Sequence, residues 1–92
     1  MTRDQLREEI RIPLTALPHH LRESLANYLV DGTPTGGFLR ACLANDLRQA
    51  VLRADPVSFA DLRAIVLLIV NYAPIQSAGS YAMIDNWAGL PA

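Results

Sequence analysis

Apolar residues recur at intervals of three and four positions along most of the chain, which is the spacing that places them on one face of an α-helix. The first strong stripe consists of Leu17, Leu21, Leu25, Tyr28 and Leu29. Pro18 suits the first turn of a helix, and Gly32 stands where a left-handed residue ends one. The pattern predicts a helix that begins at Pro18 and closes at Gly32.

A second stripe predicts one helix from Phe38 to about Arg53. Its apolar members are Phe38, Leu39, Cys42, Leu43, Leu47, Ala50 and Val51. Asp46 falls near the middle of this stripe, where an unpaired carboxylate would be costly. We therefore expect Asp46 to cap a neighbouring helix, to pair with an arginine or to reach a ligand.

The second half of the chain predicts two further helices. Residues 59–72 are apolar on nearly every side, which is typical of a helix in the centre of a protein. Ser58 opens this helix and Pro74 ends it. Ser80 has the side chain of an N-cap and predicts a last short helix over residues 81–87.

The N-terminal segment is strongly charged. Thr2 and Gln5 match a capping box, and acids and bases alternate after them. These residues predict a short, solvated helix that stops before Pro13. Residues 10–14 should be extended, because a residue before proline is pushed out of the helical region. We expect residues 1–12 to form a charged helix or arm.

These elements, with no alternating strand pattern among them, predict an all-α fold. We expect a compact bundle of four to five short helices around a central apolar helix at about residues 59–72. A chain of 92 residues should form a single helical domain, residues 1–92. The 51% hydrophobic content is rich for this size, since a small protein has a large surface to cover with polar residues. Self-association into a homo-oligomer is the simplest explanation.

The charge balance and the apolar runs restrict the partners. A formal net charge of -1 leaves no basic excess for the phosphates of a duplex, so nonspecific nucleic-acid binding is not expected. The longest apolar run, residues 64–70, is far shorter than the roughly 20 residues of a membrane-spanning helix. Residues 1–11 lack the apolar stretch of a signal peptide, and the single cysteine, Cys42, fits a reducing compartment. We expect a cytoplasmic protein without a membrane partner.

Two glycine-led turns form the candidate binding site. Gly36 and Gly37 stand directly before a predicted helix, where free backbone amides and the helix dipole favour an anion. Arg40 is the cation nearest to them in the sequence. The alternative is an ordinary turn in which the Thr35 side chain caps the helix.

The second of these turns, Gly79 and Ser80, repeats the arrangement before the last helix, with an aromatic ring at Tyr81. Two such helix starts suit one ligand. A nucleotide would place its phosphate against the amides while Tyr81, Trp87 or Tyr72 stacks on the base. Ordinary capping and core packing are the alternative for each turn taken singly.

No residue pattern indicates a metal site or catalysis. His19 and His20 are adjacent, so on a helix they point about 100° apart and do not easily chelate one ion. We expect them to be surface histidines, and we expect no metal and no cofactor. No strained nucleophile turn or other catalytic signature accompanies the serines, histidines and aspartates. The protein is therefore expected not to be an enzyme.

From Leu17 to Trp87 the chain resembles a family of small proteins encoded by tailed bacteriophages and prophages. The resemblance is carried by Tyr28, Gly32, Gly36, Gly37, Phe38, Leu39, Asn45, Asp46, Leu47, Ala50, Ala54, Asp55, Asn71, Pro74, Gly79, Ser80 and Trp87. It implies a family-like core at residues 17–87 and a joint importance of the two glycine-led turns with Asn45 and Asp46. It supplies no activity. Because small accessory phage proteins often antagonise host defence, it favours such a role by association.

The candidate ligand-binding residues are Thr35, Gly36, Gly37, Arg40, Asn45, Asp46, Gly79, Ser80, Tyr81 and Trp87. The first hypothesis is a non-enzymatic, phage-type counter-defence protein that sequesters a small phosphate-bearing ligand, such as a signalling nucleotide, in the host cytosol. An alternative is a protein–protein inhibitor of a host or defence complex. A second alternative is a small hydrolase that uses Asp46 with His19 or His20.

Overall fold

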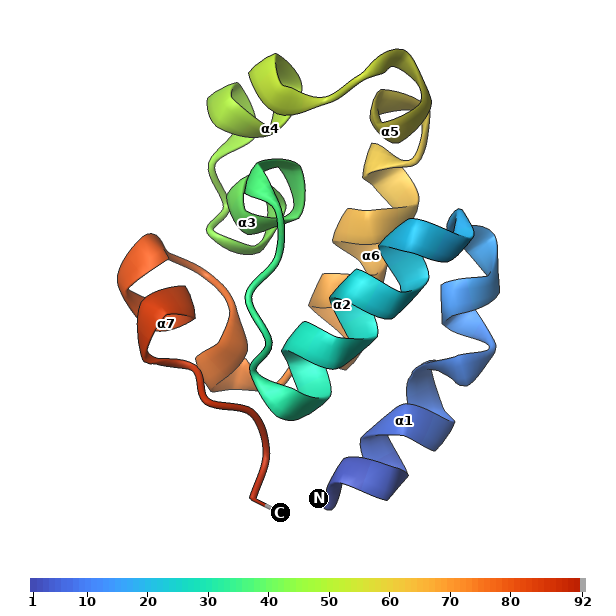
Figure 1. Cartoon of the computed structure of the whole chain (residues 1–92), viewed down its shortest axis with the longest axis vertical. Helices are drawn as coiled ribbons and strands as arrows, with labels where there is room; N and C mark the ends of the chain where they lie inside the picture. The colour runs from blue at the N-terminus through green and yellow to red at the C-terminus, as the bar shows by residue number, and fades with distance from the viewer. Residues whose placement is uncertain (92) are drawn as a thin grey trace.

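Residues 1–91, which the computed structural model describes, form helices joined by short turns and contain no strand (Figure 1). The all-α prediction is therefore confirmed. The α-helices are α1 (Arg3–Arg11), α2 (His19–Asp31), α3 (Gly37–Leu43), α4 (Leu47–Arg53), α5 (Pro56–Ala60), α6 (Leu62–Tyr72) and α7 (Tyr81–Asn86). Two short 3₁₀ helices, Pro13–Ala16 and Ile75–Ser77, lie before α2 and before α7.

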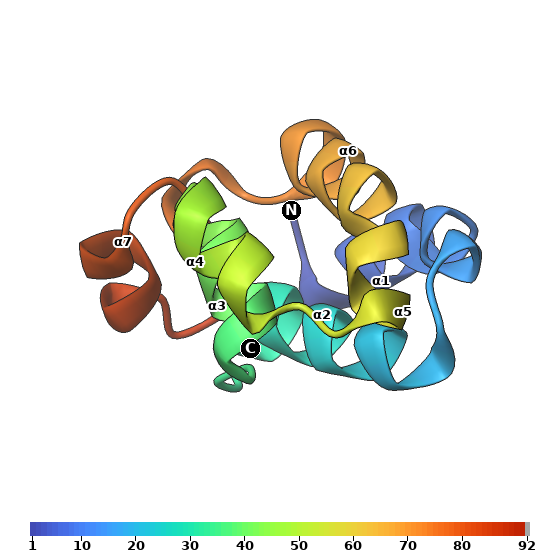
Figure 2. The ribbon, with the colours of Figure 1, turned by 90° about the horizontal axis from the view of Figure 1, so that it is seen from above.

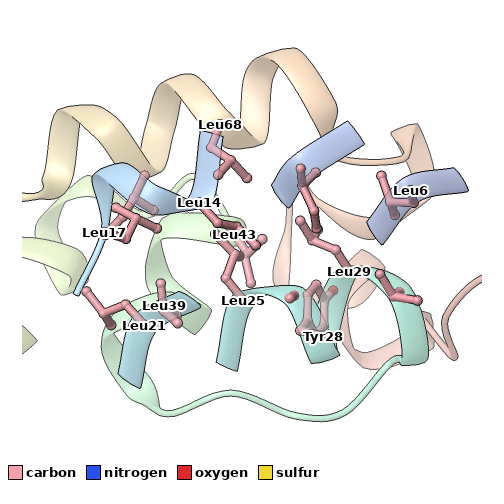
Figure 3. Close-up of a cluster of buried hydrophobic side chains, with 14 of the residues drawn as sticks. Leu6, Leu14, Leu17, Leu21, Leu25, Tyr28, Leu29, Leu39, Leu43 and Leu68 are labelled. Atoms are coloured by element: carbon pink, nitrogen blue, oxygen red, sulfur yellow. The ribbon is translucent and has the colours of Figure 1, made fainter. Parts of the chain in front are cut away.

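Helix α2 lies at the centre of the core. Its predicted apolar stripe is buried along its whole length, and Leu25 and Leu29 have no exposed surface. Side chains from other helices gather over this stripe, including Leu6 of α1, Leu43 of α3 and Leu68 of α6 (Figure 3). The stripe was predicted correctly because it follows one uninterrupted helix.

Helix α1 belongs to the core, so the prediction of a solvated helix or arm is wrong. Leu6 and Ile10 are fully buried. The capping box is confirmed, since the Thr2 hydroxyl accepts from the Gln5 amide and the Gln5 side chain accepts from the Thr2 amide. The expected extended segment at residues 10–14 is absent, because the helix continues to Arg11 and a 3₁₀ turn follows.

The predicted helix from Phe38 to Arg53 is in fact two helices. Asn45 adopts the left-handed backbone conformation, with φ of 61°, and ends the path of α3. Asn is one of the few residues that adopt this conformation readily. Asp46 then caps α4, with its Oδ1 accepting from the Gln49 amide at 3.1 Å. The predicted stripe is divided at this break: Leu39 and Leu43 of α3 are buried, whereas Leu47 of α4 is 68% exposed.

The apolar segment at residues 59–72 is not a central helix. The chain turns at Asp61, between α5 and α6, and α6 buries only Ile65 and Leu68 completely. Val70 on the same helix is 73% exposed. In Figure 2, α6 lies along an outer edge of the molecule and α2 runs through the opposite side. Helix α6 therefore has an apolar surface that faces away from the core.

The start of α1 and the last described residues of the chain meet at the C-terminal end of α2 (Figure 1). Gly32 ends α2 in the predicted left-handed conformation, with φ of 76°. A Cβ at Gly32 would lie 2.4 Å from the carbonyl carbon of Ala88, so the backbone of the tail crosses directly over this glycine. The Leu90 amide donates to the Val30 carbonyl, and Arg3 Nε donates to the Leu90 carbonyl at 2.7 Å. The tail, residues 88–90, thus contacts both α2 and α1 and holds them together.

Candidate functional site

A polar cleft lies where α3, α4 and the start of α7 meet. Its volume is about 500 Å³, and we call it the Arg40–Arg53 cleft. Its walls are formed by Gly37, Arg40, Asp46, Gln49, Arg53 and Tyr81. Four of these six residues were candidate site residues from the sequence. The structure therefore brings Gly37, Arg40, Asp46 and Tyr81 together, although α3 and α7 are far apart in the sequence.

Arg53, in the last turn of α4, extends over the first residue of α3. A Cβ at Gly37 would lie 2.7 Å from Nη1 of Arg53, so the guanidinium occupies the space that a side chain at position 37 would fill. Arg53 Nε donates to Gln49 Oε1 at 3.3 Å. Within residues 1–91, no carboxylate forms an ion pair with Arg53. Arg53 is exposed to solvent, and its charge has no counter-ion among these residues.

Arg40 supplies the second guanidinium of the cleft and is held by two groups of α7. Its Nη1 donates to Asp85 Oδ1 at 2.8 Å. Its guanidinium carbon lies 5.0 Å from the centre of the Tyr81 ring, which is within the range of a cation–π contact. The hydrogen bond to Asp85 raises the pKa of Arg40 and lowers that of Asp85. Arg40 is therefore fixed in orientation and permanently charged.

Asp46 connects α4 with α7. Its Oδ2 accepts from the Tyr81 hydroxyl at 2.7 Å, while its Oδ1 caps α4. The Tyr81 hydrogen bond, followed by the Gln49 amide, holds the pKa of Asp46 below its usual value of 3.8. The same carboxylate raises the pKa of Tyr81. Asp46 therefore has a partner, as expected, but the partners are the helix that it begins and the Tyr81 hydroxyl rather than an arginine or a neighbouring helix. These two contacts fix one wall of the cleft.

Acidic pH should weaken the connection that Asp46 makes between α4 and α7. Comparison of the wild type with Asp46→Asn should show this effect. Because folding lowers the pKa of Asp46, its carboxylate stabilises the protein above pH 3.8 and loses this effect as the pH falls through and below that value. We expect the melting temperature of the wild type to fall more steeply in acid than that of Asp46→Asn, which keeps an acceptor but cannot be protonated there. Thermal unfolding followed by circular dichroism from neutral pH to below 3.8 measures both slopes. If the melting temperatures of the wild type and Asp46→Asn fell equally with pH, this stabilising role of the Asp46 carboxylate would be contradicted.

The other candidate residues lie outside the Arg40–Arg53 cleft. Thr35 and Trp87 line a neighbouring hollow of about 320 Å³, into which Arg40 also extends. The Trp87 indole donates to the Tyr28 carbonyl at 2.9 Å, which fixes the ring against α2. Asn45 and Gly79 line an apolar groove at the other end of α3. Gly36 lines a fourth hollow with His20 and Arg53, so the set predicted from the sequence is divided among four surfaces.

The two glycine-led turns do not converge through their backbone amides. Gly36 and Gly37 stand at the start of α3, whereas the Gly79 amide donates to the Leu43 carbonyl at its end, at 2.8 Å. The Ser80 hydroxyl accepts from the Met83 amide and caps α7, as predicted. The alternative in which the Thr35 side chain caps α3 is wrong, because the N-cap is Gly36 and the Thr35 hydroxyl donates to the Gly36 carbonyl. An anion held jointly by both sets of amides is not compatible with this arrangement.

Sequence reasoning missed Gln49, Arg53 and Asp85. Gln49 and Arg53 are four residues apart on α4, and this spacing places them on one face of a helix. This spacing is visible in the sequence. The direction of that face toward α3 could not be predicted, because it depends on the break at Asn45. Asp85 pairs with Arg40 across 45 positions of sequence, and no local pattern indicates such a contact.

The histidines lie away from Asp46. His19 is close to Glu23, at 3.4 Å, and His20 lines a separate hollow with Arg53, Asp55 and Ser58. Neither histidine lines a cleft that Asp46 lines. Among residues 1–91, no three His, Cys, Asp or Glu side chains gather in a way that could hold a metal ion. No helix in this part of the chain has the length and apolar character needed to cross a membrane.

The chain was compared with models of known protein families, with curated proteins and with solved structures, and none of the three comparisons found a match. The resemblance to small bacteriophage proteins remains a prediction from the residues that carry it. The site must therefore be interpreted from its own geometry.

Proposed function

We propose that the chain is a non-enzymatic binding protein that holds a small phosphate-bearing ligand in the Arg40–Arg53 cleft. The observation that carries this proposal is the guanidinium of Arg53, which lies over Gly37 and has no carboxylate partner among residues 1–91. A guanidinium presents a planar set of donors that matches phosphate oxygens. An arginine without an internal counter-ion therefore favours an anionic guest.

The remaining walls of the cleft suit such a ligand. Arg40 is already fixed by Asp85 and Tyr81, so it loses little conformational freedom when it binds. The volume of about 500 Å³ falls within the roughly 300 to 1,000 Å³ of small-molecule sites. The Tyr81 ring, which is 37% exposed, adds an apolar surface for a base. A signalling nucleotide has both of these chemical features.

The proposed way of binding the phosphate differs from the one expected from the sequence. Side-chain guanidinium groups replace the backbone amides of the two glycine-led turns, and Gly37 provides room for Arg53. The biological setting, a phage counter-defence protein that sequesters its ligand in the host cytosol, is the part of the proposal that rests on the resemblance alone.

Arg53→Ala tests the proposal against a matched control on the same helix. Arg48 is exposed and does not line the cleft, so Arg48→Ala removes an equal charge elsewhere. In calorimetric titrations with pyrophosphate and with linear and cyclic nucleotides, we expect Arg53→Ala to weaken binding about tenfold or more, because it removes a charged hydrogen bond. Arg48→Ala should bind like the wild type. A folded wild type that binds none of these probes would overturn the proposal.

A pair of glycine variants tests the position of Arg53 without removing its charge. Gly37→Ala must displace the guanidinium, whereas a Cβ at Gly36 meets no atom within 4 Å. The displaced atoms are the far end of a flexible side chain, so the fold should survive. We expect Gly37→Ala to weaken pyrophosphate binding and Gly36→Ala to leave it unchanged. Equal affinities for the two variants would show that the place of Arg53 over α3 is irrelevant to binding.

A further inference from the structure

A second hollow shares Arg40 with the Arg40–Arg53 cleft, and we call it the Trp87 hollow. Its volume is about 320 Å³, and it lies between α7 and the turn that leads from α2 to α3 (Figure 1). Its walls include Thr35 of this turn, Asp85 and Trp87. Because Arg40 lines both spaces, they adjoin at this residue. One ligand can therefore occupy the cleft and the hollow together.

The Trp87 hollow offers a free acceptor rather than a free cation. Asp85 Oδ1 accepts from Arg40 at 2.8 Å, and Oδ2 has no hydrogen-bond partner among residues 1–91. In the cleft, by contrast, both oxygens of Asp46 are bonded, to Tyr81 and to Gln49. The hydrogen bond from Arg40 lowers the pKa of Asp85, so this carboxylate is ionised at neutral pH and only accepts. A phosphate would be repelled there, whereas a neutral group with hydrogen-bond donors fits.

An aromatic wall lies beside this acceptor. The Trp87 indole donates to the Tyr28 carbonyl at 2.9 Å, so its ring is held in a fixed orientation. A flat apolar surface next to a polar group suits a nucleobase. The Tyr81 ring cannot choose among bases, because every base has a face that stacks and the Tyr81 hydroxyl is already bonded to Asp46. Selection among bases must therefore depend on Asp85.

We infer that the ligand is a guanine nucleotide, with its phosphates in the Arg40–Arg53 cleft and the donor edge of its base at Asp85 in the Trp87 hollow. Guanine carries two adjacent donors, N1–H and the 2-amino group, and this pair matches a carboxylate. Adenine and cytosine place an acceptor nitrogen beside their amino group, and uracil flanks its N–H with two carbonyl groups. The inference rests on the proposed function, because a phosphate in the cleft brings the base to the hollow.

Calorimetric titration of the full chain with guanosine, inosine, adenosine and uridine diphosphates tests this selectivity. All four carry the same diphosphate, and inosine differs from guanosine only in lacking the 2-amino group. We expect guanosine diphosphate to bind at least tenfold more tightly than each of the others, because they lack a donor that a charged acceptor would bind.

Asp85→Asn tests whether the selectivity comes from the carboxylate. The variant keeps an oxygen for Arg40 but replaces the second oxygen by an amide group. We expect the preference for guanosine over inosine diphosphate to be lost. The ratio of the two affinities is the readout, since any change that acts through Arg40 affects both nucleotides equally. If Asp85 only held Arg40 in place, this ratio would stay at its wild-type value.

A pair of phenylalanine variants tests whether the base enters the Trp87 hollow. Thr35→Phe places a ring in the hollow, whereas Thr33 is exposed and does not line it, so Thr33→Phe is the matched control. We expect Thr35→Phe to weaken binding of guanosine diphosphate at least tenfold and Thr33→Phe to bind like the wild type. Circular dichroism checks that both variants are folded. Equal affinities for the two variants would place the base outside the hollow and overturn the inference.

Two further results would also overturn the inference. One is a wild type that binds inosine or uridine diphosphate as tightly as guanosine diphosphate. The other is an Asp85→Asn variant that keeps the guanine preference. In both cases pyrophosphate binding would still support the anion site, so the proposed function would survive. A wild type that binds neither pyrophosphate nor any of the four nucleotides would overturn the proposed function and this inference together.

Discussion

Replacing Gly32 by alanine is expected to lower the free energy of unfolding by about 2 to 5 kcal/mol. Two costs add at this position. The backbone has φ of 76°, which an L side chain adopts only with strain. The new Cβ would also lie 2.4 Å from the backbone of Ala88, and a backbone cannot move aside as a flexible side chain does. Urea unfolding followed by circular dichroism measures the loss.

Gly36→Ala is the control for this effect. Gly36 has φ of -69° and no atom within 4 Å of its added Cβ. Alanine there should be neutral, or stabilising by a few tenths of a kcal/mol, because it restricts the unfolded chain. If Gly32→Ala were as stable as Gly36→Ala, the crossing of the tail over α2 would not exist in solution.

Ile10→Ala is expected to cost about 2 to 5 kcal/mol of unfolding free energy. Ile10 has no exposed surface, and truncating it leaves a cavity in the core beside α2. This is a large share of the roughly 5 to 15 kcal/mol that stabilises a small domain. Urea unfolding should show a lower midpoint with an unchanged slope.

Ile12→Ala is the matched control for α1, because Ile12 is 67% exposed two residues further along the chain. It should change the unfolding free energy by less than about 0.5 kcal/mol. Similar small losses for both variants would mean that α1 is the solvated arm expected from its charges. A large loss for Ile10→Ala alone confirms that it is part of the core.

The features of the fold that could be predicted from the sequence are those fixed by local chemistry. Thr2 and Ser80 cap their helices as expected, and Gly32 ends α2, because each depends on neighbouring residues only. The break at Asn45 could not be predicted, since an asparagine within an apolar stripe is compatible with a continuous helix. The buried side of α1 was hidden by its many charges, although Leu6 and Ile10 are four residues apart.

The structure brings several of the predicted site residues together, but not through the contacts that were expected. Arg40, Asp46 and Tyr81 were selected for separate reasons and lie on the walls of one cleft. The expected backbone amides are not shared, because the Gly79 amide is already bonded to α3. The exposure of α6 could not be predicted either. An apolar helix has the same hydrophobic pattern whether or not the rest of its own chain covers it.

The crossing of Gly32 and Gly89 also sets a condition on how this protein folds. Asp31 pairs with Arg3 and Arg7 of α1, and residues 88–90 close over the same end of α2. Arg3 and Leu90, which are 87 positions apart, are joined directly by a hydrogen bond. An intermediate in which only α1 and α2 have paired therefore leaves this end of α2 uncovered. The native state is complete only when residues 88–90 have docked, and the partly folded chain exposes apolar surface until then.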